Sequence, residues 1–208
     1  MSRHLWVIVL LLGAVATAQD DKKNELGLLL GIEFVPSNTL AAAPGGPVTF
    51  GKSEVFQVNF ARRLFRGEKA ALWLEFPALA GPSHTVRAAN LATPVSVATF
   101  YLTPSFRVNF VPKGKLSPWV SFGGGYSLYE TSETFVSGAP NTNRLTNTAA
   151  LQFGGGLDVR TPYRVLVPVN LRFEVRDFYS FDAQDVNAAL RNSGQHGVVV
   201  SGGLLLRW

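Results

Sequence analysis

Large hydrophobic residues alternate with polar or small residues along most of the chain. In residues 25–34 the even positions carry Leu26, Leu28, Leu30, Ile32 and Phe34, whereas most odd positions carry Glu or Gly. Successive side chains of a β-strand point to opposite faces, so this period of two predicts a strand with one apolar face.

Seven further segments alternate in the same way: 55–64, 70–76, 97–111, 119–129, 149–160, 165–177 and 197–208. A tilted strand needs about 9–11 residues to cross a bilayer, which suits segments of this length. Three connections are short (65–69, 112–117 and 161–164), and they alternate with long ones rich in Pro, Gly, Ser, Thr and Asn. We predict an all-β fold, an eight-stranded antiparallel transmembrane β-barrel with an up-and-down meander and both ends in the periplasm.

The polar faces of the predicted strands carry no lysine, since all six lysines fall in the tail, connections or strand margins. A soluble sheet usually shows lysine on its wet face. Small residues and opposite charges fit a narrow lumen, in which the charges can pair. We expect a lumen charge network of Glu25, Glu33, Glu75, Arg107, Asp158, Arg160, Arg172, Glu174, Arg176 and Arg207.

The first residues have the pattern of a secretory signal peptide. Arg3 and His4 precede an apolar run from Leu5 to Val15, and residues 16–18 are small. The run is too short to span a membrane comfortably, and a polar stretch follows it. We predict a signal peptide over residues 1–18 and a single barrel domain over residues 19–208.

The chain ends on a strand with an aromatic last residue. Ser201, Gly203, Leu206 and Trp208 resemble the C-terminal insertion signal of outer-membrane barrels. With the eight strands, the chain resembles the small outer-membrane barrels of the outer-membrane protein A and X type, a porin-like β-barrel domain. This resemblance implies a bacterial outer-membrane location, contact with outer-membrane lipid, and recognition of the C-terminal strand by the barrel-assembly machinery.

Composition excludes several classes of site. The chain has no cysteine, so it has neither a disulfide framework nor a thiolate metal site. Its formal charge of +5 is mild and scattered, which does not argue for nucleic acid. No metal-ligand pattern or phosphate-binding loop is present, since the Gly runs at 123–125 and 154–156 lie in mid-strand. We expect no cofactor and no metal.

A catalytic site has only weak candidates. His84 follows Ser83 in a predicted loop, and His196 lies near Ser193 and Asp185 at the outer end of the last strand. A nucleophile and base must also converge in space. We therefore predict a non-enzymatic, structural or adhesive barrel with at most a narrow pore, whose loops have an unidentified extracellular partner. The alternatives are an outer-membrane lipid-modifying enzyme and a soluble periplasmic lipid-binding barrel with its apolar faces inward.

Overall fold

The computed structural model describes residues 22–36, 48–88, 95–131, 144–164, 166–181 and 195–208. All regular secondary structure among them is β-strand. The strands are β1 (Asn24–Phe34), β2 (Val48–Phe50), β3 (Ser53–Arg66), β4 (Ala70–Ala88), β5 (Val95–Leu102), β6 (Ser105–Phe110), β7 (Leu116–Thr131), β8 (Leu145–Arg164), β9 (Pro168–Ser180) and β10 (Gln195–Arg207). No helix in this part of the chain is long and apolar enough to cross a membrane.

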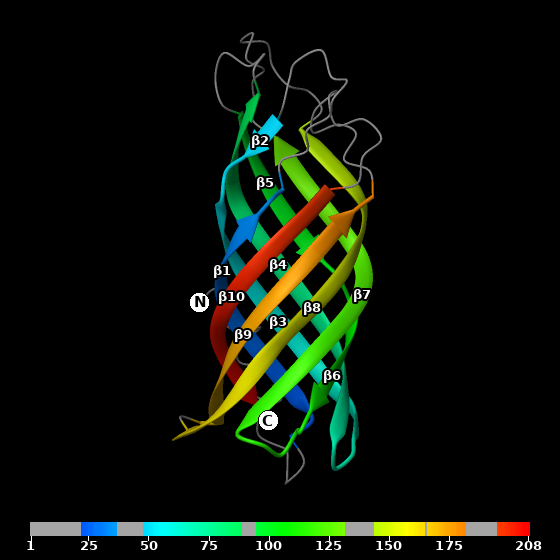
Figure 1. The fold of residues 1–208 in the computed structure, drawn as a ribbon, viewed down its shortest axis with the longest axis vertical. Coiled ribbons are helices and arrows are strands. Elements are labelled where there is room, and N and C mark those ends of the chain that lie inside the picture. The colour runs from blue at the N-terminus through cyan, green and yellow to red at the C-terminus, as the bar shows by residue number, and fades with distance from the viewer. Residues whose placement is uncertain (1–21, 37–47, 89–94, 132–143, 165, 182–194) are drawn as a thin grey trace, which may run out of the picture.

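The strands close into a tall, tilted barrel (Figure 1). Every pairing is antiparallel, and β1 pairs with β3 on one side and with β10 on the other. Both β5 and β6 lie between β4 and β7, so together they form one strand of the barrel, which is interrupted at Thr103–Pro104. The short β2 only pairs with the far end of β4. The predicted eight-stranded antiparallel up-and-down barrel is therefore confirmed.

Several predicted strand boundaries differ from the structure, and two of these differences change the interpretation of the residues concerned. The third strand was expected to end at residue 76, but β4 continues to Ala88 because its second half pairs with β5. His84 therefore belongs to a strand, opposite Val97, and not to a loop. Residues 161–164, predicted as a turn, extend β8 as far as the pair Arg164↔Pro168, beyond an irregularity in the register.

The barrel has two distinct ends. The start of β1, the end of β10 and the short connections 67–69, 111–115 and 166–167 share one end, here called the terminal end. The opposite ends of β1, β4, β7 and β9 lead into the longer connections, and we call this the loop end. The signal peptide predicted over residues 1–18 lies outside the described residues and stays a prediction.

Alternation along the strands sorts the side chains into an outer wall and an interior. Large apolar side chains on the wall are solvent-accessible, with Leu30 70 % and Phe106 56 % exposed. Their strand neighbours Leu29 and Arg107 are 1 % and 0 % exposed. Phe residues also lie exposed on β3, β7, β8 and β9 (Phe56, Phe122, Phe153 and Phe173). A belt of this kind, contiguous around the wall, is far larger than the apolar patches that soluble monomers expose.

Candidate functional site

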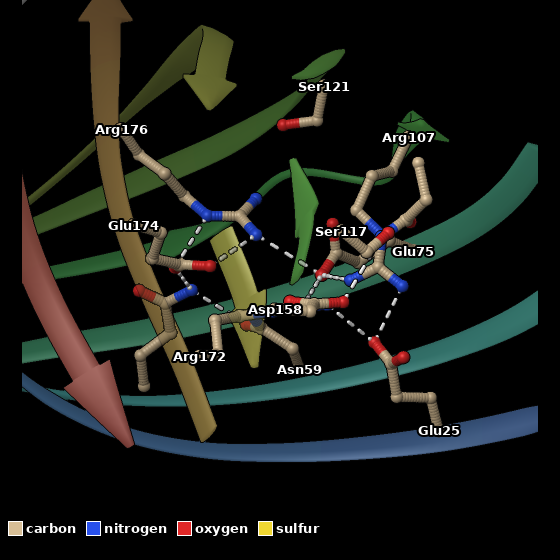
Figure 2. Close-up of polar contacts among 12 residues, drawn as sticks. Glu25, Asn59, Glu75, Arg107, Ser117, Ser121, Asp158, Arg172, Glu174 and Arg176 are labelled. Atoms are coloured by element: carbon tan, nitrogen blue, oxygen red, sulfur yellow. Dashed lines mark hydrogen bonds and ion pairs between the residues drawn. The ribbon is translucent and has the colours of Figure 1, made fainter. Parts of the chain in front are cut away.

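Two arginines and two glutamates form the centre of an ion-pair network inside the barrel (Figure 2). Arg107 of β6 donates from Nη2 to Glu25 Oε1 at 2.6 Å and from Nη1 to Glu75 Oε1 at 3.1 Å. Arg172 of β9 reaches the same two oxygens at 2.9 and 3.1 Å. All four side chains are fully buried. Four separate strands, β1, β4, β6 and β9, are thereby joined across the lumen.

Four more charged groups extend the network. Arg176 donates to Glu174 at 2.7 Å and to Glu75 at 3.1 Å. Asp158 accepts from Arg172 at 2.8 Å and from Arg207 at 2.6 Å. Arg207 also reaches Glu25 Oε2 at 2.7 Å, so it joins β10 to β1 at the strand pair that closes the barrel.

The network is balanced in charge. Its four arginines (Arg107, Arg172, Arg176 and Arg207) face four carboxylates (Glu25, Glu75, Asp158 and Glu174), which gives a net charge of zero. Removing charges from water is costly unless they are paired and hydrogen-bonded, and here each carboxylate has an arginine partner. The arrangement links strands and leaves no net charge to attract an ion.

Two tryptophans cover the guanidinium groups. The guanidinium carbons of Arg107, Arg172 and Arg176 lie 5.7, 5.0 and 5.2 Å from the ring centroid of Trp119. Trp73 lies in the same way beside Arg107 and Arg207. Cations over an aromatic face are attracted by the ring quadrupole, so the rings stabilise the arginines while filling the lumen.

Gly156 makes room for Trp119. A Cβ built on Gly156 would lie 2.7 Å from the Trp119 ring and 2.4 Å from the carbonyl oxygen of Phe173. This close approach explains why one position of the Gly run at 154–156 carries no side chain.

Two of the ten predicted network residues lie elsewhere. Glu33 is buried nearer the loop end, where it accepts hydrogen bonds from Thr99 Oγ1 and Tyr101 Oη, each at 3.2 Å. Arg160 is exposed at the terminal end and donates to the carbonyl oxygens of Lys113 and Pro112. The prediction for Arg160 is wrong because its strand position lies at the rim, where the side chain turns to main-chain carbonyls.

An apolar plug occupies the interior near the loop end. It consists of Val55, Leu79, Tyr101, Ala150, Phe178 and Val199, all buried. The Tyr101 and Phe178 rings stack with centroids 4.6 Å apart. Between the ionic network and the loop end, the interior of the barrel is therefore packed with side chains, as expected of a lumen enclosed by only eight strands.

Sequence analysis missed this plug and the covering tryptophans. Phe178 lies two residues beyond Arg176 on the same strand face, just past the predicted end of that strand. Tyr101 alternates with the outward Phe100 and Leu102. Tyr101 already lies within the predicted segment 97–111, on the same face as Arg107, and extending the segment 165–177 by one residue would have included Phe178.

Of the candidate catalytic residues, the structure describes the side chain of His196 alone. His196 is exposed on the wall, with Nδ1 2.8 Å from Asp177 Oδ2 and its ring beside Tyr179. Ser193 and Asp185 lie outside the described residues, as do the side chains of Ser83 and His84. Among the described residues, no group of His, Cys, Asp or Glu could hold a metal ion.

The four residues of the predicted insertion signal lie along the closing strand. Ser201, Gly203 and Leu206 of β10 pair with Gly31, Leu29 and Leu26 of β1. Trp208 exchanges main-chain hydrogen bonds with Asn24, at 2.9 and 3.1 Å. The segment thus completes the barrel, while its recognition by an assembly machinery stays a prediction.

No protein-family model matches the chain, and no curated protein matches it. Among solved structures, Neisserial surface protein A (NspA) is similar with a TM-score of 0.49 and 11 % sequence identity, covering 89 % of this chain and 96 % of that chain. Ail, the attachment invasion locus protein of Yersinia pestis, in complex with the heparin analogue sucrose octasulfate, has a TM-score of 0.47 and 11 % identity over 88 % of this chain and 99 % of its own.

The outer membrane enzyme PagL is also similar, with a TM-score of 0.41 and 10 % identity over 88 % of this chain and 98 % of that chain. With identities near one residue in ten and TM-scores below 0.5, the roles of these proteins do not transfer to this chain. One fold can carry many functions, so function has to follow from the side chains of this barrel.

Proposed function

We propose that the chain is an integral protein of the bacterial outer membrane, with a structural or adhesive role and a closed lumen. One observation carries this proposal: the wall exposes Leu and Phe side chains on all sides, while arginines and carboxylates are buried inside. Lipid is the solvent in which such a wall is stable, and a closed barrel satisfies its main-chain hydrogen bonds within the bilayer.

The interior supports the closed lumen. Ion pairs and tryptophans fill the section near the terminal end, and the apolar plug fills the section near the loop end. An ion crossing the barrel would have to displace side chains in both sections. We therefore expect no steady conductance, and a narrow pore would need both sections to rearrange together.

The other two functions receive less support. A soluble lipid carrier needs apolar side chains inside and charged ones outside, which is the reverse of this barrel. An enzyme needs a nucleophile beside a base, and the exposed His196 contacts Asp177 and Tyr179. The neighbouring Ser180 is fully buried in the interior, where its hydroxyl lies 2.6 Å from that of Tyr129. We propose a non-enzymatic barrel whose adhesive surface, if it has one, is its loop end.

Fractionation followed by gel electrophoresis tests the membrane assignment. We expect the protein in the outer-membrane fraction, with a folded band that resists detergent and shifts in mobility on boiling. Recovery from the soluble periplasmic fraction without a shift would overturn the proposal. Planar-bilayer recording of the refolded protein then tests the lumen, and sustained single-channel steps would show that the lumen is not closed.

A further inference from the structure

A cavity opens at the terminal end of the barrel, outside the ionic network. Its volume is about 400 Å³. Six basic residues line it: Lys22, Arg63, Arg66, Arg160, Arg164 and Arg207. No aspartate or glutamate is among the described residues that line it. We call this cavity the basic mouth.

The basic mouth is built from distant parts of the chain. Lys22 precedes β1, Arg63 and Arg66 lie at the end of β3, and Arg160 and Arg164 lie at the end of β8. The guanidinium of Arg63 lies over the inward-facing Trp73 ring, 5.7 Å from its centroid. The basic groups therefore face a shared concave space and are not scattered over an outer surface.

The basic side chains of the mouth differ in their contacts. Arg207 is neutralised by Glu25 and Asp158. Arg160, by contrast, donates to two main-chain carbonyls, which orient the guanidinium without cancelling its charge. Burial lowers the pKa of Lys22, and the nearby charges of Arg164, Arg160 and Arg207 lower it further. The positive charges of these arginines repel that of Lys22, and a bound anion would reduce this repulsion.

The deep wall of the basic mouth offers polar atoms that lack partners. Trp73, only 4 % exposed, has an indole N–H with no hydrogen-bond partner among the described residues. Asn109 and Asn170, which are also buried and line the cavity, each have an unpartnered amide oxygen. A buried polar group without a partner is costly, and a ligand bearing both acceptors and hydroxyl donors would satisfy these atoms.

We propose that the basic mouth binds a small periplasmic molecule carrying at least two phosphate or carboxylate groups. Guanidinium groups present paired N–H donors that match these oxyanions, and several of them surround one cavity. Only the compartment of the ligand depends on the proposed membrane orientation. Binding itself depends on the cavity, so it can be measured on the folded barrel in detergent.

Arg62 provides a matched control. It is adjacent to Arg63 on β3, but it is exposed on the outer wall and does not line the cavity. An anionic lipid headgroup beside the barrel would contact Arg62, whereas a molecule inside the basic mouth would contact Arg63. Comparing the two variants therefore separates a soluble ligand from a lipid headgroup.

The test is calorimetric titration of the folded protein in a zwitterionic detergent, with pyrophosphate as the probe. We expect saturable binding of about one pyrophosphate per barrel, weakened by added salt. Arg63→Gln and Arg164→Gln should each weaken binding about tenfold or more, the range expected for loss of a charge-assisted hydrogen bond. Arg62→Gln should bind as the unchanged protein does. The boiling-dependent gel shift confirms that each variant is folded.

Three results would overturn the proposal. They are no saturable heat with the folded protein, an equal loss in Arg62→Gln and Arg63→Gln, or loss of pyrophosphate binding in nanodiscs of phosphatidylglycerol but not of phosphatidylcholine. The last two results would indicate that the basic residues bind lipid headgroups and not a soluble anion. Failure of the barrel to fold or to shift on boiling would instead contradict the proposed function, so the two failures are distinguishable.

Proton uptake gives a second readout. A bound anion should raise the lowered pKa of Lys22, so binding at alkaline pH should take up protons. Titration in two buffers of different ionisation enthalpy measures this uptake, and Lys22→Gln should reduce it. Uptake that is unchanged in Lys22→Gln would contradict the placement of the anion beside Lys22.

Discussion

Two neighbouring regions of the same interior use arginine in opposite ways. In the ionic network each carboxylate is paired with arginine, and all eight groups are deeply buried or nearly so. In the basic mouth no carboxylate is among the described lining residues, and several of its basic groups reach solvent. Arg207 belongs to both regions. Its two ion pairs turn it toward the network, so it marks the boundary between them.

The comparison teaches that the number of arginines says little until their partners are known. A balanced, buried cluster stabilises one arrangement of strands, since breaking any pair leaves a charge without compensation. Several basic groups that line one accessible cavity create a positive potential, which favours the binding of an anion. Stability measurements should therefore respond to the network, and binding measurements should respond to the basic mouth.

The largest effect on stability is expected for Arg172→Met. This change leaves Asp158, Glu25 and Glu75 with fewer partners in a buried site, at a cost of about 3–5 kcal/mol. Urea unfolding of the barrel in lipid vesicles measures it. A loss below about 1 kcal/mol would show that the network contributes little. Arg160→Met, at the rim, is the matched control and should change stability only slightly.

Phe178→Ala should have the next largest effect on the stability of the barrel. The substitution removes a fully buried ring that stacks on Tyr101, so it should destabilise by about 3 kcal/mol through lost contact and a cavity. The same unfolding assay measures it, and Phe173→Ala on the outer wall of the same strand controls for loss of a phenyl group. Equal effects of the two changes would contradict a packed plug.

Tyr129→Phe should have a smaller effect. Its hydroxyl lies 2.6 Å from Ser180 Oγ and 3.2 Å from the Tyr101 hydroxyl, both buried. Removing it should cost about 1 kcal/mol, the usual contribution of one hydrogen bond plus some loss at its partners. Tyr163→Phe, on an exposed ring, should leave the midpoint of unfolding unchanged.

The smallest effect is expected for Arg144→Gln. Arg144 pairs with Glu130 at 2.7 Å, but the two side chains are 37 % and 48 % exposed. Exposed ion pairs contribute about 0–1 kcal/mol and are screened by salt, so the midpoint should barely move. A loss similar to that of Arg172→Met would show that burial does not distinguish the two kinds of ion pair.

Much of the network could be predicted from strand parity alone. Glu25, Glu75, Arg107, Asp158, Arg172, Glu174, Arg176 and Arg207 all occupy inward positions of alternating segments, and the structure brings all eight together. Parity fixes which face a residue takes, but not its height along the barrel. That limit explains Glu33, which has the expected face and a different set of neighbours.

By itself the sequence determined that the chain is built from strands and which residues share a face, because a strand presents its side chains with a fixed period of two. The polar faces without lysine favoured placing the charges inside, and the structure decided it. Only the tertiary structure decided which charges meet. Heights are set by the shear of the closed barrel and by pairings such as β1 with β10, which join residues far apart in the chain. The same closure gathered Lys22 with the ends of β3 and β8 into one basic mouth, which no local pattern contains.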